Sequence, residues 1–199
     1  MPKLYLVLTR TNTNLSKAIR FFTKRTYNHI SLALDDRLDS LYSFGRRRPK
    51  NPFYAGFVRE DIPKGFYHYF NDTACIIYEL TVSDLQWHRL QSYLAPFITN
   101  PLHYKFNFIG LILCGLSIPF ASKNTYFCSQ FISEALEKSG IYSFGKDCRL
   151  IQPACFMDLP NAKVIYRGKI VSYRPIAPTE SKILQPAEQT LVELSLIHI

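Results

Sequence analysis

The chain has 199 residues, of which 47% are hydrophobic and 15% aromatic, and this composition excludes a chain that is disordered throughout. There is room for one domain with a sizeable core. With 24 Lys and Arg against 15 Asp and Glu, the formal net charge of +9 favours anionic partners in general and identifies no particular one.

The first part of the chain predicts strands and one helix. Residues 4–8 are strand-like, and Asn14 is a candidate N-cap for a helix with an apolar face over residues 15–22. Residues 29–34 and 38–44 predict a β-hairpin whose turn is formed by Asp35, Asp36 and Arg37.

From residue 45 to residue 65 the chain is basic and rich in Pro and Gly, which predicts a long surface loop. The run Arg46-Arg47-Arg48 lies in this segment. A solvated loop is the plain interpretation. In the functional interpretation, Arg46 and Arg47 bind substrate at the mouth of an active site. No aromatic-interleaved basic helix or zinc-finger spacing accompanies the run, so we do not expect nucleic-acid binding.

The second part of the chain predicts further strands and helices. A strand is expected over residues 74–82, and Ser83 with Gln86 forms a capping-box pattern before a helix over 84–98. The apolar run 106–120 is shorter than the roughly 20 residues that cross a bilayer, and it predicts a buried helix. A helix then begins at Cys128 and ends near Gly140.

A short turn over 152–159 and strands at 163–166 and 170–173 complete the predicted elements. Together they predict an α+β fold in which a mainly antiparallel sheet or partly open barrel packs against helices. We expect one domain over 1–175 and a disordered tail over 176–199. The last six residues, LSLIHI, resemble a translated sequencing-adapter end, which would make His198 an artefact.

The cysteines and the start of the chain indicate where the protein resides. The five cysteines form no CxxC pair and have no zinc spacing, so we expect a reduced protein without a metal or other cofactor. The strand-like pattern begins almost at once, without the features of an export signal, which predicts a cytoplasmic location.

Two residues far apart in the sequence are candidates for nucleophilic catalysis. Cys128 begins the run CSQFI at the predicted start of an amphipathic helix, where free N–H groups favour a thiolate. It is also in phase with the apolar stripe, as an inert core cysteine would be. On the predicted strand 29–34, His29, Ser31 and Ala33 share one face, so a helix carrying Cys128 could pack close to the imidazole.

A catalytic imidazole usually needs a third group that orients it. With a turn at 35–37, Ser43 falls opposite His29, and a register slip would place Tyr42 there. Tyr126 precedes the cysteine run and is expected to line the site. These hydroxyl groups are the candidates that the neighbouring strand offers.

The segments 28–34 (NHISLAL) and 126–132 (YFCSQFI), with Leu136 and Gly140 after them, resemble the circularly permuted papain-like amidases of the NlpC superfamily, the YaeF/YiiX kind. Lecithin retinol acyltransferase is a more distant likeness. The resemblance extends over about 174 residues. It implies a permuted papain-like fold with Cys128 as nucleophile and His29 as base, and relatives often carry His or Glu as the third group.

The resemblance implies a thiol hydrolase that cleaves an amide bond of a peptide or cell-wall fragment through an acyl-enzyme. Two alternatives stay open. The first is a lipid-acting acyltransferase or phospholipase-like enzyme with the same chemistry, for which the positive charge permits peripheral contact with an anionic membrane. The second is a non-catalytic anion-binding module on the same scaffold.

Overall fold

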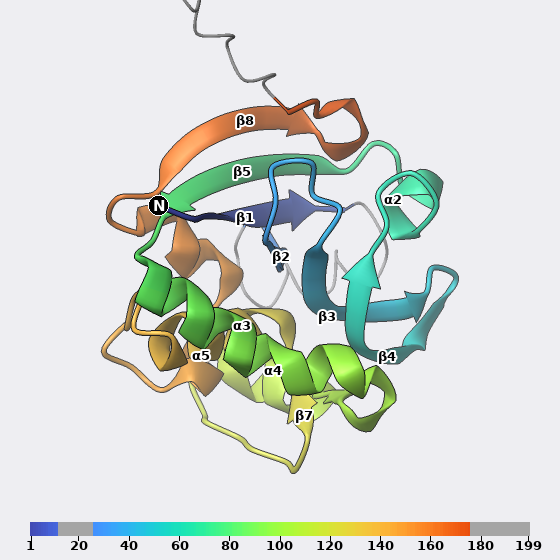
Figure 1. The fold of residues 1–199 in the computed structure, drawn as a ribbon. Coiled ribbons are helices and arrows are strands. Elements are labelled where there is room, and N and C mark those ends of the chain that lie inside the picture. Colours follow the sequence, from blue (N-terminus) through green and yellow to red (C-terminus); the bar gives the residue numbers. More distant parts are fainter. Residues whose placement is uncertain (12–25, 176–199) are drawn as a thin grey trace, which may run out of the picture.

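The computed structural model describes residues 1–11 and 26–175. Its architecture is mixed α+β, with an eight-stranded sheet of order β7-β6-β4-β3-β2-β1-β5-β8 packed against helices (Figure 1). All paired strands are antiparallel except β6 and β7, so the predicted α+β class with a mainly antiparallel sheet is confirmed. The strands are β1 (Lys3–Arg10), β2 (His29–Ala33), β3 (Leu41–Arg48), β4 (Asn51–Glu60), β5 (Ala74–Thr81), β6 (Lys105–Phe106), β7 (Thr125–Tyr126) and β8 (Lys163–Lys169).

The described α-helices differ in length, and short 3-10 turns connect several elements. Helices α3 and α5 lie together on one side of the sheet, and α2 lies beside the β4 end (Figure 1). The α-helices are α2 (Phe66–Tyr69), α3 (Asp84–Thr99), α4 (Phe108–Gly115) and α5 (Cys128–Lys138), and the 3-10 helices are Pro101–His103, Cys148–Leu150, Pro153–Asp158 and Ile170–Ser172. None of the helices in the described ranges is long and apolar enough to cross a membrane.

Alternation along the central strands gives the sheet two apolar faces. Because successive strand side chains point to opposite faces, Ile30 of β2 and Phe44 of β3 join the core that contains α5. Ala33 and Val7 face the other way, into a smaller core that includes Tyr67 of α2. A residue on β2 therefore belongs either to the α5 face or to the α2 face.

Several predicted elements are confirmed. Strands β1, β2 and β5 and helix α5 lie where the patterns place them, and Ser83 and Gln86 form the predicted capping box of α3. The predicted helix over 15–22 and the tail over 176–199, with His198, lie outside the described residues.

The predicted loop over 45–65 is wrong, because most of it is a β-hairpin. Strand β3 continues to Arg48, Pro49 and Lys50 make the turn, and β4 pairs back along β3. Gly56 resembles a turn residue in the sequence, yet it lies within β4, where an added Cβ would come 2.4 Å from the Tyr104 carbonyl oxygen. The absence of a side chain at Gly56 therefore lets the backbone of Tyr104 approach β4 closely, and it does not mark a turn.

The second predicted strand of the first hairpin begins too early. The connection runs from Leu34 to Ser40, because the Asp35 carboxylate accepts hydrogen bonds from the Asp39 and Ser40 N–H groups. Leu38 has a φ of 61°, which no strand residue adopts. The longer loop changes which residues of β2 and β3 lie opposite each other.

Two further expectations are also wrong. Residues 170–173, predicted as a strand, begin with a 3-10 helix that follows β8. Helix α4 occupies only part of the apolar run 106–120 and is buried on one face only: Gly110 and Cys114 are buried, whereas Ile109 and Ile112 are 60% and 64% exposed.

The aromatic core under β3 is expected to contribute strongly to stability. The Phe44 ring is fully buried and lies 5.2 Å from the rings of both Tyr126 and Phe131. Replacing Phe44 by Ala should lower the free energy of unfolding by about 3–5 kcal/mol. In urea titrations, the matched change Phe53→Ala, at a side chain that is 83% exposed, should stay within about 0.5 kcal/mol of wild type. Equal losses in the two variants would contradict this account of the core.

Candidate active site

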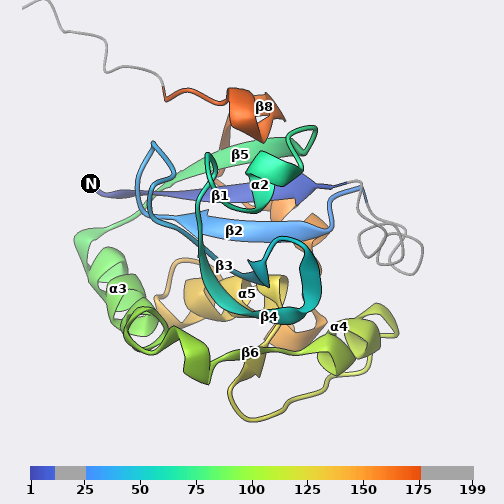
Figure 2. The same cartoon turned by 90° about the vertical axis from the view of Figure 1, so that its right-hand side faces the viewer.

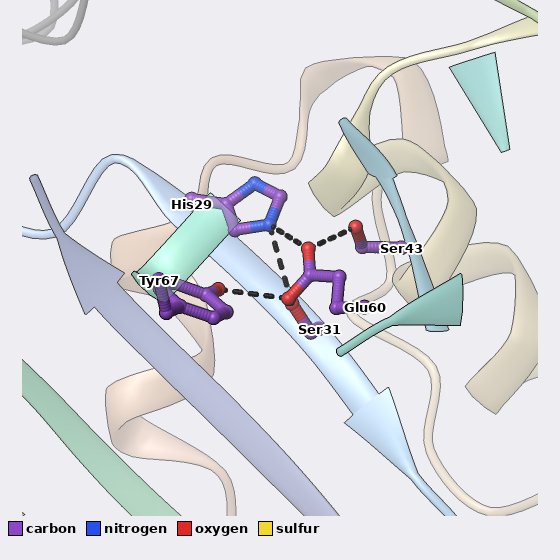
Figure 3. A network of polar contacts seen from close by, with 5 residues as sticks. All are labelled: His29, Ser31, Ser43, Glu60 and Tyr67. Carbon is purple, nitrogen blue, oxygen red and sulfur yellow. Dashed lines mark hydrogen bonds and ion pairs between the residues drawn. The ribbon is translucent and has the colours of Figure 1, made fainter. Parts of the chain in front are cut away.

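The Glu60 carboxylate at the end of β4 lies at the centre of a network of side-chain hydrogen bonds (Figure 3). Its Oε1 accepts hydrogen bonds from His29 Nε2 at 2.8 Å and Ser43 Oγ at 2.5 Å. Its Oε2 accepts from Ser31 Oγ at 3.0 Å and Tyr67 OH at 2.8 Å. A carboxylate has about four acceptor positions, so these donors satisfy it fully although it lies inside the protein.

Local strand geometry brings the donors together. His29 and Ser31 alternate onto the same face of β2, which is the α2 face. On β3, Ser43 pairs with Val58, two residues before Glu60, so Ser43 and the carboxylate share that face. Tyr67 comes from α2, which covers the network. Three neighbouring strands and one helix therefore contribute to a single cluster.

The opposite charges of His29 and Glu60 each stabilise the ionised form of the other. Burial alone would lower the pKa of His29, but the Glu60 charge and hydrogen bonds with Cys128 and Glu60 outweigh it and raise the pKa to about 10. Burial would raise the pKa of Glu60, yet the His29 charge and the donated hydrogen bonds lower it overall. Burial and the Glu60 charge raise the pKa of Tyr67, which keeps its hydroxyl a donor. At neutral pH the pair is imidazolium and carboxylate.

Cys128 reaches this cluster from the other side of the sheet. It is the first residue of α5 and is 4% exposed. Because Nε2 of His29 bonds Glu60 and Ser31, the second ring nitrogen, which Figure 3 shows turned away from the carboxylate, is the one left for the sulfur. The helix has Phe127 at its N-cap with no side-chain cap, so its first N–H groups can stabilise negative charge.

A cavity of about 200 Å³ joins Cys128, His29 and Glu60. Gly45 also lines it, and continuing the pairing of Leu32 with Tyr42 places Gly45 opposite His29. A Cβ at position 45 would lie 3.6 Å from His29 Cε1, so a larger side chain there would crowd the imidazole. The rest of the lining is largely apolar, from the β3–β4 hairpin, α2 and α4.

The structure brings together only some of the predicted site residues. His29 and Cys128 line the same cavity. Ser43 is in the cluster, but it bonds Glu60 rather than lying opposite His29. The predicted register was off by two residues, and an even shift keeps the same face of the strand. Tyr42 points into the α5 core, where its ring stacks on Phe57 at 5.8 Å.

The predicted substrate-binding residues have other contacts. Arg46 and Arg47 line the cavity from β3 and not from a loop. Arg47 Nη2 donates to the carbonyl oxygens of Pro101 and Tyr104, each at 2.6 Å, so its guanidinium ties the hairpin to the segment before β6. The Arg46 guanidinium lies 5.3 Å from the centre of the Phe66 ring.

Tyr126 packs in the aromatic core and is not among the described residues that line this cavity. Its ring lies 5.2 Å from that of Phe44 and 5.5 Å from that of Phe97. Burial raises the pKa of Tyr126 to about 12. These contacts give the side chain a packing role.

Glu60 and Tyr67 are the members of the cluster that the sequence did not reveal. Glu60 lies in the segment interpreted as a loop, where Pro49, Pro52 and Gly56 obscured the strand pattern. No alternation marked the end of this strand, because Phe57 and Val58 are both apolar and Arg59 and Glu60 are both charged. Tyr67 gave no signal of its own, because its role depends on how α2 folds over the sheet.

No three His, Cys, Asp or Glu side chains gather into a possible metal site within residues 1–11 and 26–175. The sequence matched no protein-family model, and a search of the curated proteins found no relative.

The ion pair makes the stability of the protein dependent on pH in both directions. The raised pKa of His29 contributes stability that is complete below about 6.5 and is lost as the pH rises through about 10. The lowered pKa of Glu60 contributes stability that is present above 4.5 and is lost as the pH falls through the folded value. The variant Glu60→Gln should bring the His29 pKa down by more than about one unit, measured by NMR titration of its imidazole. An unchanged His29 pKa in this variant would mean that the Glu60 carboxylate does not stabilise the protonated imidazole.

Proposed function

We propose that the protein is a thiol hydrolase that cleaves an amide bond, with Cys128 as nucleophile, His29 as general base and acid, and Glu60 as the group that orients His29. One observation carries the proposal: the thiol at the start of α5 shares a cavity with an imidazole that a buried carboxylate holds on its far nitrogen. This is the arrangement by which thiol enzymes generate and retain a nucleophile.

The proposed reaction has two halves. In the starting state His29 already holds the proton of the Cys128 thiol, so the thiolate adds directly to the substrate carbonyl and forms a C–S bond. The tetrahedral oxyanion faces the N–H groups at the start of α5. As the C–N bond breaks, the His29 imidazolium protonates the departing amine and a thioester remains on Cys128.

Water then replaces the amine. His29 removes a proton from a water molecule, whose oxygen attacks the thioester carbonyl. The C–S bond breaks, the acid is released, and the proton on His29 restores the starting state of the pair. Glu60 stays ionised throughout, because its four donors and its lowered pKa favour the carboxylate.

Glu60 also bears on the alternatives. The best support for the non-catalytic interpretation was that the neighbouring strand offered no His or Glu to orient His29, and the hydrogen bond from His29 to Glu60 weakens that support. The order of the elements, with the histidine strand before the cysteine helix, supports the proposed relationship to the permuted papain-like amidases of the NlpC superfamily. The cytoplasmic location remains part of the proposal.

The proposed pair predicts a selectively reactive thiol. At neutral pH, iodoacetamide should label Cys128 at least about tenfold faster than the exposed Cys155, as measured by peptide mass spectrometry over time. The change His29→Ala should remove this advantage and leave the labelling of Cys155 unchanged. Equal rates at the two cysteines in the wild-type protein would argue for an inert core thiol.

Hydrolysis tests the assignment directly, with 4-nitrophenyl acetate as a simple acyl donor. The change Cys128→Ala should lower kcat/KM by about 10³-fold or more, because no covalent intermediate can form. The matched variant Cys155→Ala should behave as wild type. Activity retained by Cys128→Ala would refute the nucleophile.

A further inference from the structure

Helix α4 exposes apolar side chains that the sequence predicts to be buried. Ile109 and Ile112 are 60% and 64% exposed, and directly after the helix Leu116 and Ile118 are 63% and 49% exposed. Isolated exposed aliphatic side chains are common on protein surfaces. Here four occur within ten residues, which marks an interaction surface.

The tip of the β3–β4 hairpin extends this surface. Phe53 is 83% exposed, and its ring centre lies 6.4 Å from that of Phe108 at the start of α4. Figure 2 shows the hairpin and α4 on the same side of the molecule, with α3 on the opposite side. We call the group Phe53, Ile109, Ile112, Leu116 and Ile118 the apolar face.

The sequence segments that carry the apolar face are basic. The two sequence segments that build this end of the molecule, residues 40–59 and 100–133, contain no Asp or Glu, and all 15 acidic residues of the chain lie elsewhere. The same segments contain seven basic residues: Arg46, Arg47, Arg48, Arg59, Lys50, Lys105 and Lys123.

Several of these cations are held beside aromatic rings. The guanidinium groups of Arg47 and Arg48 lie 5.7 and 5.4 Å from the Tyr54 ring centre, and the Lys50 ammonium lies 5.6 Å from that of Tyr69. Cations and aromatic rings on the hairpin, beside protruding apolar side chains, match the layered chemistry of an anionic bilayer, with phosphates outside and hydrocarbon beneath.

We propose that the apolar face docks on the surface of an anionic phospholipid bilayer. Phe53, Ile109 and Ile112 enter the headgroup boundary while the surrounding Lys and Arg contact phosphate groups. Binding therefore requires both the electrostatic attraction of the basic residues and the hydrophobic contact of the apolar face.

Docking there would bring the cavity to the lipid. Pro52 of the hairpin and Phe108 and Leu111 of α4 line the cavity that contains Cys128. The elements that meet the membrane are thus also walls of the reactive site. The substrate class that follows is an acyl compound held in or on an anionic membrane. This inference about the substrate rests on the proposed function, whereas the docking itself does not.

The test is flotation of the full chain with vesicles of phosphatidylcholine alone or mixed with phosphatidylglycerol. Cys128→Ala protein is used so that binding is read without any turnover. We expect it to float with the anionic vesicles and not with the neutral ones, and added salt should weaken the binding.

Matched variants locate the contact. Ile109→Asp and Leu85→Asp make the same kind of change at side chains that are each 60% exposed on a helix, but Leu85 lies on α3, away from the apolar face. Ile109→Asp should weaken partitioning at least about tenfold, because a carboxylate is repelled by the anionic surface and loses the apolar contact. Leu85→Asp should bind as the parent does. Thermal unfolding of both variants checks that they are folded.

Three results would overturn the docking proposal. The first is no flotation with anionic vesicles, and the second is equal loss in Ile109→Asp and Leu85→Asp. The third is self-association without vesicles, seen by sedimentation velocity and abolished by Ile109→Asp, which would make this face an interface between two copies. None of these outcomes affects thiol reactivity or hydrolysis of 4-nitrophenyl acetate, so they are separable from a failure of the proposed function.

Discussion

The arrangement of the site depends on one buried carboxylate and the donors that satisfy it. An ionised carboxylate inside a protein is strongly unfavourable unless each of its acceptor positions is occupied. Glu60 meets this condition only when β2, β3, β4 and α2 take their observed positions, since each supplies a donor or the carboxylate itself. The same bonds that make the charge tolerable therefore fix the register of the strands and the place of the covering helix.

This constraint also determines the state of the imidazole. A buried histidine with only apolar neighbours would be neutral, whereas here the adjacent negative charge keeps the proton on the ring. An imidazolium next to a sulfur favours thiolate by charge and holds the proton that a departing amine needs. In the proposed reaction, activation of the nucleophile and protonation of the leaving group would thus share one origin, the Glu60 carboxylate on β4, rather than arise from the reacting atoms.

Much of the framework could be predicted from the sequence because the relevant signals are local. Alternation identified β1, β2 and β5, and the Ser83 and Gln86 pattern marked the start of α3. The pairing of His29 with Cys128 was suggested by the order of two short motifs. The same reasoning failed for β4. Pro49 marks only the tight turn before this strand, whereas Pro52 and Gly56 lie inside it, and Gly56 permits a close approach by Tyr104.

The orienting group was missed for a related reason. Identifying Glu60 required knowing both that β4 exists and that it returns beside β3, and the second fact is a matter of tertiary pairing. The exposure of α4 could not be predicted from the sequence either. A run of apolar residues has the same pattern whether it packs in a core or lies on an apolar surface. The composition of residues 106–120 carried no information about which of these applies.

The members of the carboxylate cluster all come from residues 29–67, whereas the sulfur arrives with α5, much later in the chain. The two halves of the proposed catalytic pair are thus encoded in separate stretches of the chain. A chain whose last helices have not yet packed carries Cys128 apart from His29, so the proposed enzyme would become reactive only when assembly is complete. Under that proposal, newly made or partly unfolded copies would not act on the carbonyl groups around them.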